Sequence, residues 1–326
     1  MIQNLTIRNF KSIKDLNISC KKLNVFIGEP NSGKSNIIEA FALQSQNSFP
    51  QELNKQIFRY KTIGDLFFDF NINNPIEVQT DQIHTVLKYA IRQDGIIENQ
   101  FHFFIKKDNV RPVTISHNGK INDSGDSGQT NVHFYEYRRL ESYSINYLPH
   151  LSPPHGDNLP SLLLANNEFK KWVSEFLKSK DLKLTLKPTE NEILASKLID
   201  DEIYPYPYIA LSETIQRIIF YTIAIMSNKN SVILLDEPDT NTFPLYTKDM
   251  AEQIALDESN QFFITTHNPY LLLSLIEKSK EVDINIYITQ MKNYKTVVNL
   301  LTTEQISEVL DLNSDVFFNF DNILSI

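Results

Sequence analysis

Apolar and polar positions follow two different patterns along this chain. Residues 2–8 alternate between apolar and polar side chains, which is the period of a half-buried strand. Residues 57–107 are rich in Phe, Ile, Tyr and Val, and turn residues occur at 71–75, at 94–95 and, just after the segment, at 108–109. This combination predicts a small antiparallel sheet with hairpins.

Residues 23–27 and 232–235 are short unbroken apolar runs, which are typical of strands buried on both faces of a parallel sheet. After residue 205, such runs alternate with segments of helical periodicity, and this alternation indicates an α/β fold with a mostly parallel core sheet. Helices are expected over 161–179, 190–203, 212–226 and 247–256 and after 268, and further strands over 132–137, 261–265, 284–289 and 295–299.

The first buried run leads into a loop with the pattern G-x-x-x-x-G-K-S. A strand before this loop and helical periodicity over 36–43 after it are the context in which the pattern forms a phosphate-binding P-loop. The glycines let backbone N–H groups point inward, and the helix N-terminus carries partial positive charge. Lys34 is expected to reach the outer phosphates of a nucleotide, and Ser35 to bind Mg²⁺. The expected nucleotide-binding residues are Gly28, Glu29, Pro30, Asn31, Ser32, Gly33, Lys34, Ser35 and Asn36.

Two carboxylates directly follow the second buried run. Asp236 and Glu237 are expected at the carboxyl end of a strand, which is where ligands bind in open α/β sheets. Asp236 is expected to hold Mg²⁺ opposite Ser35, and Glu237 to polarise the water that attacks the γ-phosphate. A plain acidic turn is the alternative interpretation, and the P-loop earlier in the chain favours the catalytic one.

His267 follows the strand expected over 261–265. A lone histidine is usually structural. One at the same sheet edge as the acidic residues is placed to contact the γ-phosphate or the attacking water, so a catalytic role is the favoured interpretation.

Composition narrows the class of protein further. The chain has 326 residues with 41% hydrophobic and 22% charged residues, as in ordinary globular proteins. A formal charge of −9 and a pI near 5.3 give no general attraction to nucleic acid or to anionic membranes. The single cysteine, Cys20, excludes an internal disulfide and suits a reducing compartment. No apolar run approaches the about 20 residues that span a bilayer. A cytoplasmic protein is therefore expected.

These motifs together resemble an ABC-type ATPase of the SMC/RecF-like and OLD-like branch of the AAA family. Ile7-Arg8-Asn9-Phe10-Lys11-Ser12 is similar to the I-x-N-F-x-S opening of this branch. Asp236-Glu237-Pro238 resembles its Walker B motif, and Thr265-Thr266-His267-Asn268-Pro269 its switch-histidine segment. The likeness is clear at both ends of the chain and weak in the middle. It implies a stand-alone bacterial ATPase head without a coiled coil or a Toprim domain.

The resemblance also implies that residues 211–217 take the place of the signature motif. In the family, the serine of this motif, here Ser212, caps the γ-phosphate of ATP bound to the other subunit. A hydroxyl beside the N–H groups of a helix N-terminus is suited to bind an anion. Glu213 and Thr214 replace the usual glycine, and Glu213 would repel a triphosphate unless it points away. The alternative is an ordinary capped core helix.

The glutamine of the family's Q-loop is not identifiable in this sequence. Its expected neighbourhood is 134–139, which contains no Gln. Arg138 and Arg139 are candidate replacements that would contact phosphate or base, and a solvated pair of arginines is the equal alternative.

By the resemblance, residues 1–326 form a single ABC-type ATPase head. The expected parts are a P-loop part over 1–50, an antiparallel β subdomain over 51–139, a helical lobe over 140–210, and a last part over 211–326 with the signature helix, the Walker B motif and the switch histidine.

The resemblance implies hydrolysis of ATP with Mg²⁺ in an ATP-dependent homodimer that sandwiches two nucleotides. One use of this cycle is to control a separately encoded effector such as a nuclease or a toxin, for example in phage defence. A second is RecF-like action on nucleic acid in repair or maintenance, which the acidic pI does not favour. A third is a nucleotide-dependent scaffold with little hydrolysis, against which the intact Glu237 and His267 argue.

Overall fold

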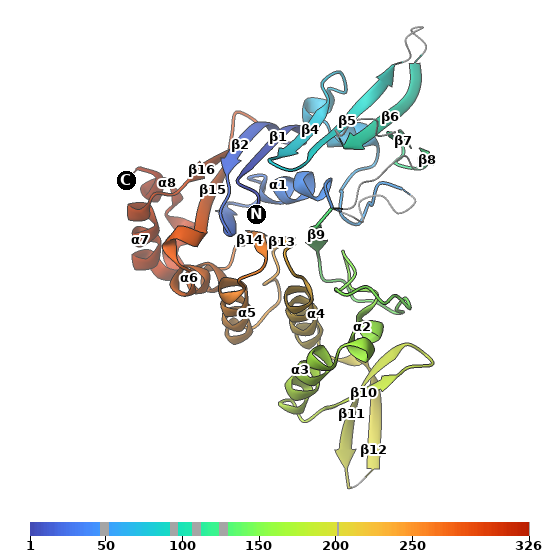
Figure 1. Cartoon of the computed structure of the whole chain (residues 1–326). Coiled ribbons are helices and arrows are strands. Elements are labelled where there is room, and N and C mark those ends of the chain that lie inside the picture. Colours follow the sequence, from blue (N-terminus) through green and yellow to red (C-terminus); the bar gives the residue numbers. More distant parts are fainter. Residues whose placement is uncertain (46–51, 92–96, 106–111, 124–129, 201, 326) are drawn as a thin grey trace.

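The computed structural model describes residues 1–45, 52–91, 97–105, 112–123, 130–200 and 202–325. Within these residues the fold is α/β and contains sheets of seven, six and three strands (Figure 1). The six-stranded sheet is mostly parallel and carries the P-loop, as the sequence predicts. The α/β fold class with an additional antiparallel sheet is therefore confirmed.

The central sheet is built from β3 (Leu23–Gly28), β9 (Val132–Tyr135), β13 (Val232–Asp236), β14 (Gln261–Thr265), β15 (Ile284–Lys292) and β16 (Lys295–Leu300). Its strand order is β16-β15-β3-β14-β13-β9, and only β16 runs antiparallel to its neighbour. Asp236 is in register with Thr265, and Thr265 with Phe26. The strand ends that carry the predicted site residues therefore meet at one edge of the sheet.

Helices cover both faces of the central sheet: α1 (Lys34–Ala42) on one face, and α4 (Glu213–Ser227), α5 (Pro244–Leu256) and α6 (Pro269–Lys278) on the other (Figure 1). Alternate residues of one strand enter two different cores. Phe26 packs in the core with α1 and the antiparallel sheet, whereas Val25 and Ile27 pack in the core with α4, α5 and α6. The unbroken apolar run over 23–27 follows from this burial on both faces.

The seven-stranded sheet is antiparallel and consists of β1 (Asn4–Phe10), β2 (Ile13–Ser19), β4 (Ile76–Thr80), β5 (His84–Ile91), β6 (Ile97–Ile105), β7 (Val113–Ser116) and β8 (Ile121–Asp123). The strand predicted over 2–8 is confirmed, and it belongs to this sheet rather than to the sheet of the P-loop. Strands β4 to β6 confirm the sheet predicted within 57–107. The predicted turns at 94–95 and 108–109 lie outside the described residues.

The segment expected to be a helical lobe contains α2 (Leu159–Ala165), α3 (Asn167–Lys178) and a sheet of β10 (Lys183–Lys187), β11 (Glu192–Ile199) and β12 (Glu202–Pro207). The helix predicted over 190–203 is wrong. Its apolar spacing fitted a helix, but β11 pairs with β10 on one side and β12 on the other. Pro205 and Pro207 within β12 also suit an edge strand, because proline lacks the N–H that a helix interior needs.

The last part of the described chain, α7 (Thr303–Leu312) and α8 (Phe320–Ser325), lies beside β15 and β16 (Figure 1). Val309, Phe320 and Ile323 are buried there. Among the helices that the structure describes, none combines the length and the apolar character needed to cross a membrane.

A substitution of Phe263 in β14 can test the packing of the core beneath the P-loop helix. Its ring is fully buried and meets Phe41 of α1 edge-on, with 4.9 Å between the ring centroids. Phe263→Ala is expected to lower the free energy of unfolding in urea by about 3–5 kcal/mol, because it leaves a cavity. The matched control is Phe318→Ala, at a ring that is 87% exposed, with an expected change within about 0.5 kcal/mol. Equal effects of the two variants would contradict this description of the core.

Candidate functional site

Two glycines shape the loop between β3 and α1. Gly28 and Gly33 have φ angles of 148° and 99°, which residues with a Cβ atom rarely adopt. A Cβ atom on Gly33 would lie 2.0 Å from Oγ1 of Thr296, and one on Gly28 would lie 2.2 Å from the carbonyl oxygen of Thr289. Both glycines are therefore required for this curl of the loop, which presents the N-terminus of α1 to an anion.

Lys34 is buried beneath this loop at the start of α1. Its Nζ donates hydrogen bonds to the carbonyl oxygens of Gly28 at 3.0 Å and Glu29 at 2.8 Å. Burial lowers the pKa of Lys34 to about 8, while the nearby Glu237 and Asp236 carboxylates act in the opposite direction. A phosphate group at this point would favour the charged form of the amine.

Asp236 links the end of β13 to the P-loop helix. The hydroxyl of Ser35 donates a hydrogen bond to Oδ1 of Asp236 at 3.1 Å, and the hydroxyl of Thr265 donates to the same oxygen at 2.5 Å. Burial raises the pKa of Asp236, and these two hydrogen bonds counteract the shift. A hydroxyl and a carboxylate oxygen this close together are hard oxygen ligands of the kind that suits Mg²⁺.

The described residues contain no group of three or more His, Cys, Asp or Glu side chains that would enclose a metal ion. A cation between Ser35 and Asp236 would therefore need further ligands from phosphate or water. Mg²⁺ has this preference, because it binds proteins through one or two carboxylates and keeps several waters.

Glu237 and His267 lie together on the open side of the loop. Nε2 of His267 is 3.0 Å from Oε1 of Glu237, and the hydrogen bond from His267 holds the pKa of Glu237 below its ordinary value. Glu237 has a φ of 45°, a left-handed conformation that costs a non-glycine residue about 1–3 kcal/mol. Its N–H donates to the hydroxyl of Thr265 at 3.0 Å, which helps to hold this strained backbone in place.

Most of the predicted P-loop residues, together with Glu237 and His267, line one pocket of about 300 Å³, which we call the phosphate pocket. Its lining residues are Pro30, Asn31, Gly33, Lys34, Ser35, Asn36, Arg59, Glu237 and His267. The structure thus brings the P-loop, the acidic strand end and the histidine together. Arg59 is the member that sequence reasoning missed. It stands outside any motif, and its place depends on an ion pair with Glu39 of α1 that the sequence does not reveal.

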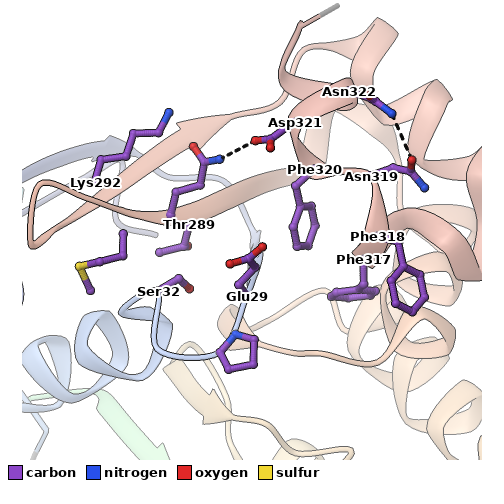
Figure 2. Close-up of a pocket in the computed structure, with 13 residues that line it drawn as sticks. Glu29, Ser32, Thr289, Lys292, Phe317, Phe318, Asn319, Phe320, Asp321 and Asn322 are labelled. Atoms are coloured by element: carbon purple, nitrogen blue, oxygen red, sulfur yellow. Dashed lines mark hydrogen bonds between the residues drawn. The ribbon is translucent and has the colours of Figure 1, made fainter.

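A larger cavity of about 470 Å³ lies on the other flank of the P-loop, against β15 and α8 (Figure 2). The side chains of Glu29 and Ser32, which were expected at the nucleotide, line this cavity instead. Its lining also contains Asp321 and the rings of Phe317 and Phe320, with Lys292 at one side. Two carboxylates and aromatic rings do not suit a triphosphate, so the smaller pocket is the candidate phosphate site despite its size.

Ser212 begins α4 as the sequence predicts. Its hydroxyl accepts a hydrogen bond from the N–H of Ile215 at 3.4 Å, which is the geometry of an N-cap. Glu213 points to Arg217, with 2.7 Å between Oε1 and Nε, and this ion pair lowers the pKa of Glu213. The negative charge of Glu213 is thus compensated within its own helix. Ser212 does not line the phosphate pocket of its own chain.

Arg138 and Arg139 do not line the phosphate pocket either. Arg138 pairs with Glu136 at 3.1 Å and donates to the carbonyl oxygen of Gln56 at 2.9 Å. Arg139 donates to the carbonyl oxygen of Ile209. The partners of both arginines lie outside the lining of the phosphate pocket, so the structure does not support these arginines as replacements for the Q-loop glutamine.

Comparisons with known proteins agree with this geometry. The AAA ATPase domain family matches residues 1–215. The endonuclease GajA of Bacillus cereus (strain HuB5-5) is 23% identical over 273 residues, which are 78% of this chain and 37% of GajA. The chain therefore spans little more than a third of the length of this curated relative.

Solved structures of SMC heads also match. The SmcHead bound to the C-winged helix domain of ScpA has a TM-score of 0.53 and 17% identity, over 94% of this chain and 99% of that one. The SMC head domain from Thermotoga maritima has a TM-score of 0.44 and 14% identity, over 93% of this chain and 99% of that one. The family match and the shared fold lead to one conclusion. The chain belongs to the AAA ATPase domain family, and its fold is similar to that of the SmcHead.

Proposed function

We propose that this protein binds ATP with Mg²⁺ in the phosphate pocket and hydrolyses it to ADP and phosphate. The observation that carries the proposal is the Glu237–His267 pair, with 3.0 Å between Oε1 and Nε2, at the mouth of a pocket whose floor is the P-loop. A carboxylate and an imidazole at this point are placed to orient a water molecule toward the last phosphate.

The residues at the phosphate pocket have different roles in the proposed hydrolysis. Lys34 and the N-terminal N–H groups of α1 bind the phosphates. Ser35 and Asp236 would hold Mg²⁺, which supplies charge neutralisation to the phosphate oxygens. Glu237 accepts a hydrogen bond from the attacking water and orients it in line with the leaving oxygen, and His267 stabilises charge on the γ-phosphate. The hydrogen bond from His267 holds the pKa of Glu237 below its ordinary value, so the carboxylate is ionised at neutral pH and can accept a hydrogen bond.

Two such heads would pair around the nucleotides. The P-loop covers one side of the triphosphate, and the γ-phosphate needs a second charge-stabilising surface. Ser212 with the N-terminus of α4 is the candidate surface, supplied by a partner copy with two-fold symmetry. The Glu213–Arg217 ion pair supports this role, because it reduces the repulsion that a free carboxylate would exert on the phosphate.

The ATP cycle would control a separate effector protein. GajA, to which this chain is similar over 273 residues, is an endonuclease. A nuclease that responds to ATP-dependent pairing of the heads is therefore the effector class to test first, and phage defence is the setting in which such a pair would act.

The first test removes the proposed catalytic carboxylate. Glu237→Gln is expected to keep ATP affinity but to slow hydrolysis by about 10²–10⁴-fold, because the amide is a poor acceptor for the water proton. Lys34→Ala should instead weaken binding itself. Single-turnover hydrolysis and titration with a fluorescent ATP analogue separate the two effects. Glu252→Gln, an exposed carboxylate paired with Lys278 on α6, is the matched control. Near-normal hydrolysis by Glu237→Gln would remove Glu237 from the mechanism.

The second test uses the low pKa of Lys34. In the free protein this amine loses its proton above pH 8, whereas phosphate binding requires the charged form. ATP affinity should therefore be constant below pH 8 and fall toward tenfold per pH unit above it. Equilibrium titrations from pH 7 to pH 9.5 measure this slope, and Lys34→Ala should bind weakly but without the slope. An unchanged slope in Lys34→Ala would assign the titration to another group.

The third test concerns pairing of the heads. Glu237→Gln with saturating ATP and Mg²⁺ should form a dimer, because the nucleotide that holds the two heads is no longer hydrolysed. Adding Ser212→Arg should break this dimer by steric and electrostatic clash. Light scattering with ATP and with ADP reports the mass of each variant. A Glu237→Gln protein that stays monomeric would overturn the sandwich, and a dimer insensitive to Ser212→Arg would exclude Ser212 from the interface.

A further inference from the structure

A buried carboxylate lies behind the phosphate pocket, on the same helix as Lys34 and Ser35. The side chain of Glu39 is only 4% exposed, and two cations contact it. Lys11, from the turn between β1 and β2, pairs with Oε2, and Arg59 pairs with Oε1. An ionised carboxylate is costly to bury unless opposite charges and hydrogen bonds compensate it. This ion-pair cluster is therefore a built feature of the core and not a chance surface contact.

The contact between Arg59 and Glu39 fixes the direction of the guanidinium group. Nε of Arg59 donates to Oε1 of Glu39 at 2.6 Å, and Nη2 contacts the same carboxylate. The backbone N–H of Arg59 is 3.5 Å from Oε2. One edge of the planar guanidinium is thus used by Glu39, and its other N–H groups remain outside this ion pair. The Arg59 side chain is 65% exposed and lines the phosphate pocket.

Lys11 has a different part in this cluster. Its side chain is 13% exposed, so it lies inside, where burial lowers the pKa of its amine and Glu39 counteracts the shift. Lys11 is largely buried, whereas Arg59 is exposed and lines the pocket, so Arg59 is the cation of this pair that can meet a ligand there.

The charge of Arg59 reaches the opposite wall of the pocket. The pKa of Glu237 is lowered mainly by the hydrogen bond from His267, and Arg59 adds to this shift from a distance. Burial dominates the raised pKa of Asp236, and Arg59 opposes it. The electrostatic effect of Arg59 therefore extends to both carboxylates, Asp236 and Glu237. Within the proposed function, the last phosphate of ATP would lie beside these two carboxylates.

We propose that Glu39 is a positioning residue that holds Arg59 toward the γ-phosphate of bound ATP. This inference rests on the proposed function. Lys34, Ser35 and Glu39 are all on α1, so the groups that bind phosphate and the anchor of Arg59 belong to one rigid helix. Without the anchor, an exposed arginine on an irregular segment would lose this orientation, and ATP binding would have to order the side chain at a cost in conformational entropy.

The test is a double-mutant cycle read by nucleotide affinity. Glu39→Gln, Arg59→Ala and the double variant are titrated with a fluorescent non-hydrolysable ATP analogue and with fluorescent ADP. Glu39→Gln and Arg59→Ala should each weaken the ATP analogue about tenfold, as expected for one charged hydrogen bond, and weaken ADP much less. The double variant should be no weaker than Arg59→Ala alone, because Glu39 acts only through Arg59. Additive losses, or equal losses for ATP and ADP, would overturn the proposal.

Arg59→Lys separates orientation from charge, and it is tolerated by the fold because this side chain is exposed. Lysine keeps the positive charge but cannot form the forked contact with Glu39, so the tenfold loss should persist. Full ATP affinity in Arg59→Lys would show that charge alone matters and would sink the positioning role. This variant decides the question even where Glu39→Gln does not fold.

Two controls complete the experiment. Glu77→Gln removes an ion pair of the antiparallel sheet, with 3.4 Å between Glu77 and Arg8, and it should leave both affinities unchanged. Lys34→Ala tests the proposed function itself. If Lys34→Ala weakens ATP while the Glu39 and Arg59 variants do not, the phosphate pocket stands and the positioning role fails. If Lys34→Ala has no effect either, the proposed function fails first.

Discussion

The hydrogen bond between Ser35 and Asp236 is the contact on which the candidate site depends. It joins two residues that are 201 positions apart, at 3.1 Å, and it ties the P-loop helix to the end of β13. The contact exists because β3, β14 and β13 are parallel and in register, so their carboxyl ends meet. Thr265, between them in the sheet, donates to the same Asp236 oxygen and also accepts from the N–H of Glu237. One threonine thus aligns both carboxylates with the loop.

The helix that carries Lys34 and Ser35 and the helix that Ser212 begins pack in two different hydrophobic cores. α1, with Lys34 and Ser35, packs in the core shared with the antiparallel sheet, whereas α4, which Ser212 begins, packs in the core shared with α2, α3, α5 and α6. The hydroxyl of Thr214 donates to the carbonyl oxygen of Asn241 at 3.2 Å, directly after the acidic strand end. This hydrogen bond connects the start of α4 to the loop that carries Glu237.

Local signals predicted the P-loop, the acidic strand end, the N-cap at Ser212 and the buried parallel strands, because each is specified by a few neighbouring residues. Features that depend on distant partners were missed. Residues 190–203 have helical apolar spacing, but pairing with β10 and β12 makes most of them strand. The strand over 2–8 was recognised, yet nothing local shows which sheet it joins. Arg59 belongs to no motif, and its contact with the buried Glu39, twenty residues earlier, cannot be read from the sequence.

The local charges of the phosphate pocket differ from the net charge of the chain. The chain carries −9 overall, yet Lys34, Arg59 and the N-terminus of α1 place positive charge at one point. Asp236 and Glu237 face them, so within the proposed function a triphosphate would add negative charge beside two carboxylates. The protein's own cations do not neutralise this sum, which is why a divalent cation between Ser35 and Asp236 belongs to the proposal. The same excess makes the direction of Arg59 matter, because a cation turned away from the pocket is farther from the phosphate and is screened by more water than one held at the pocket.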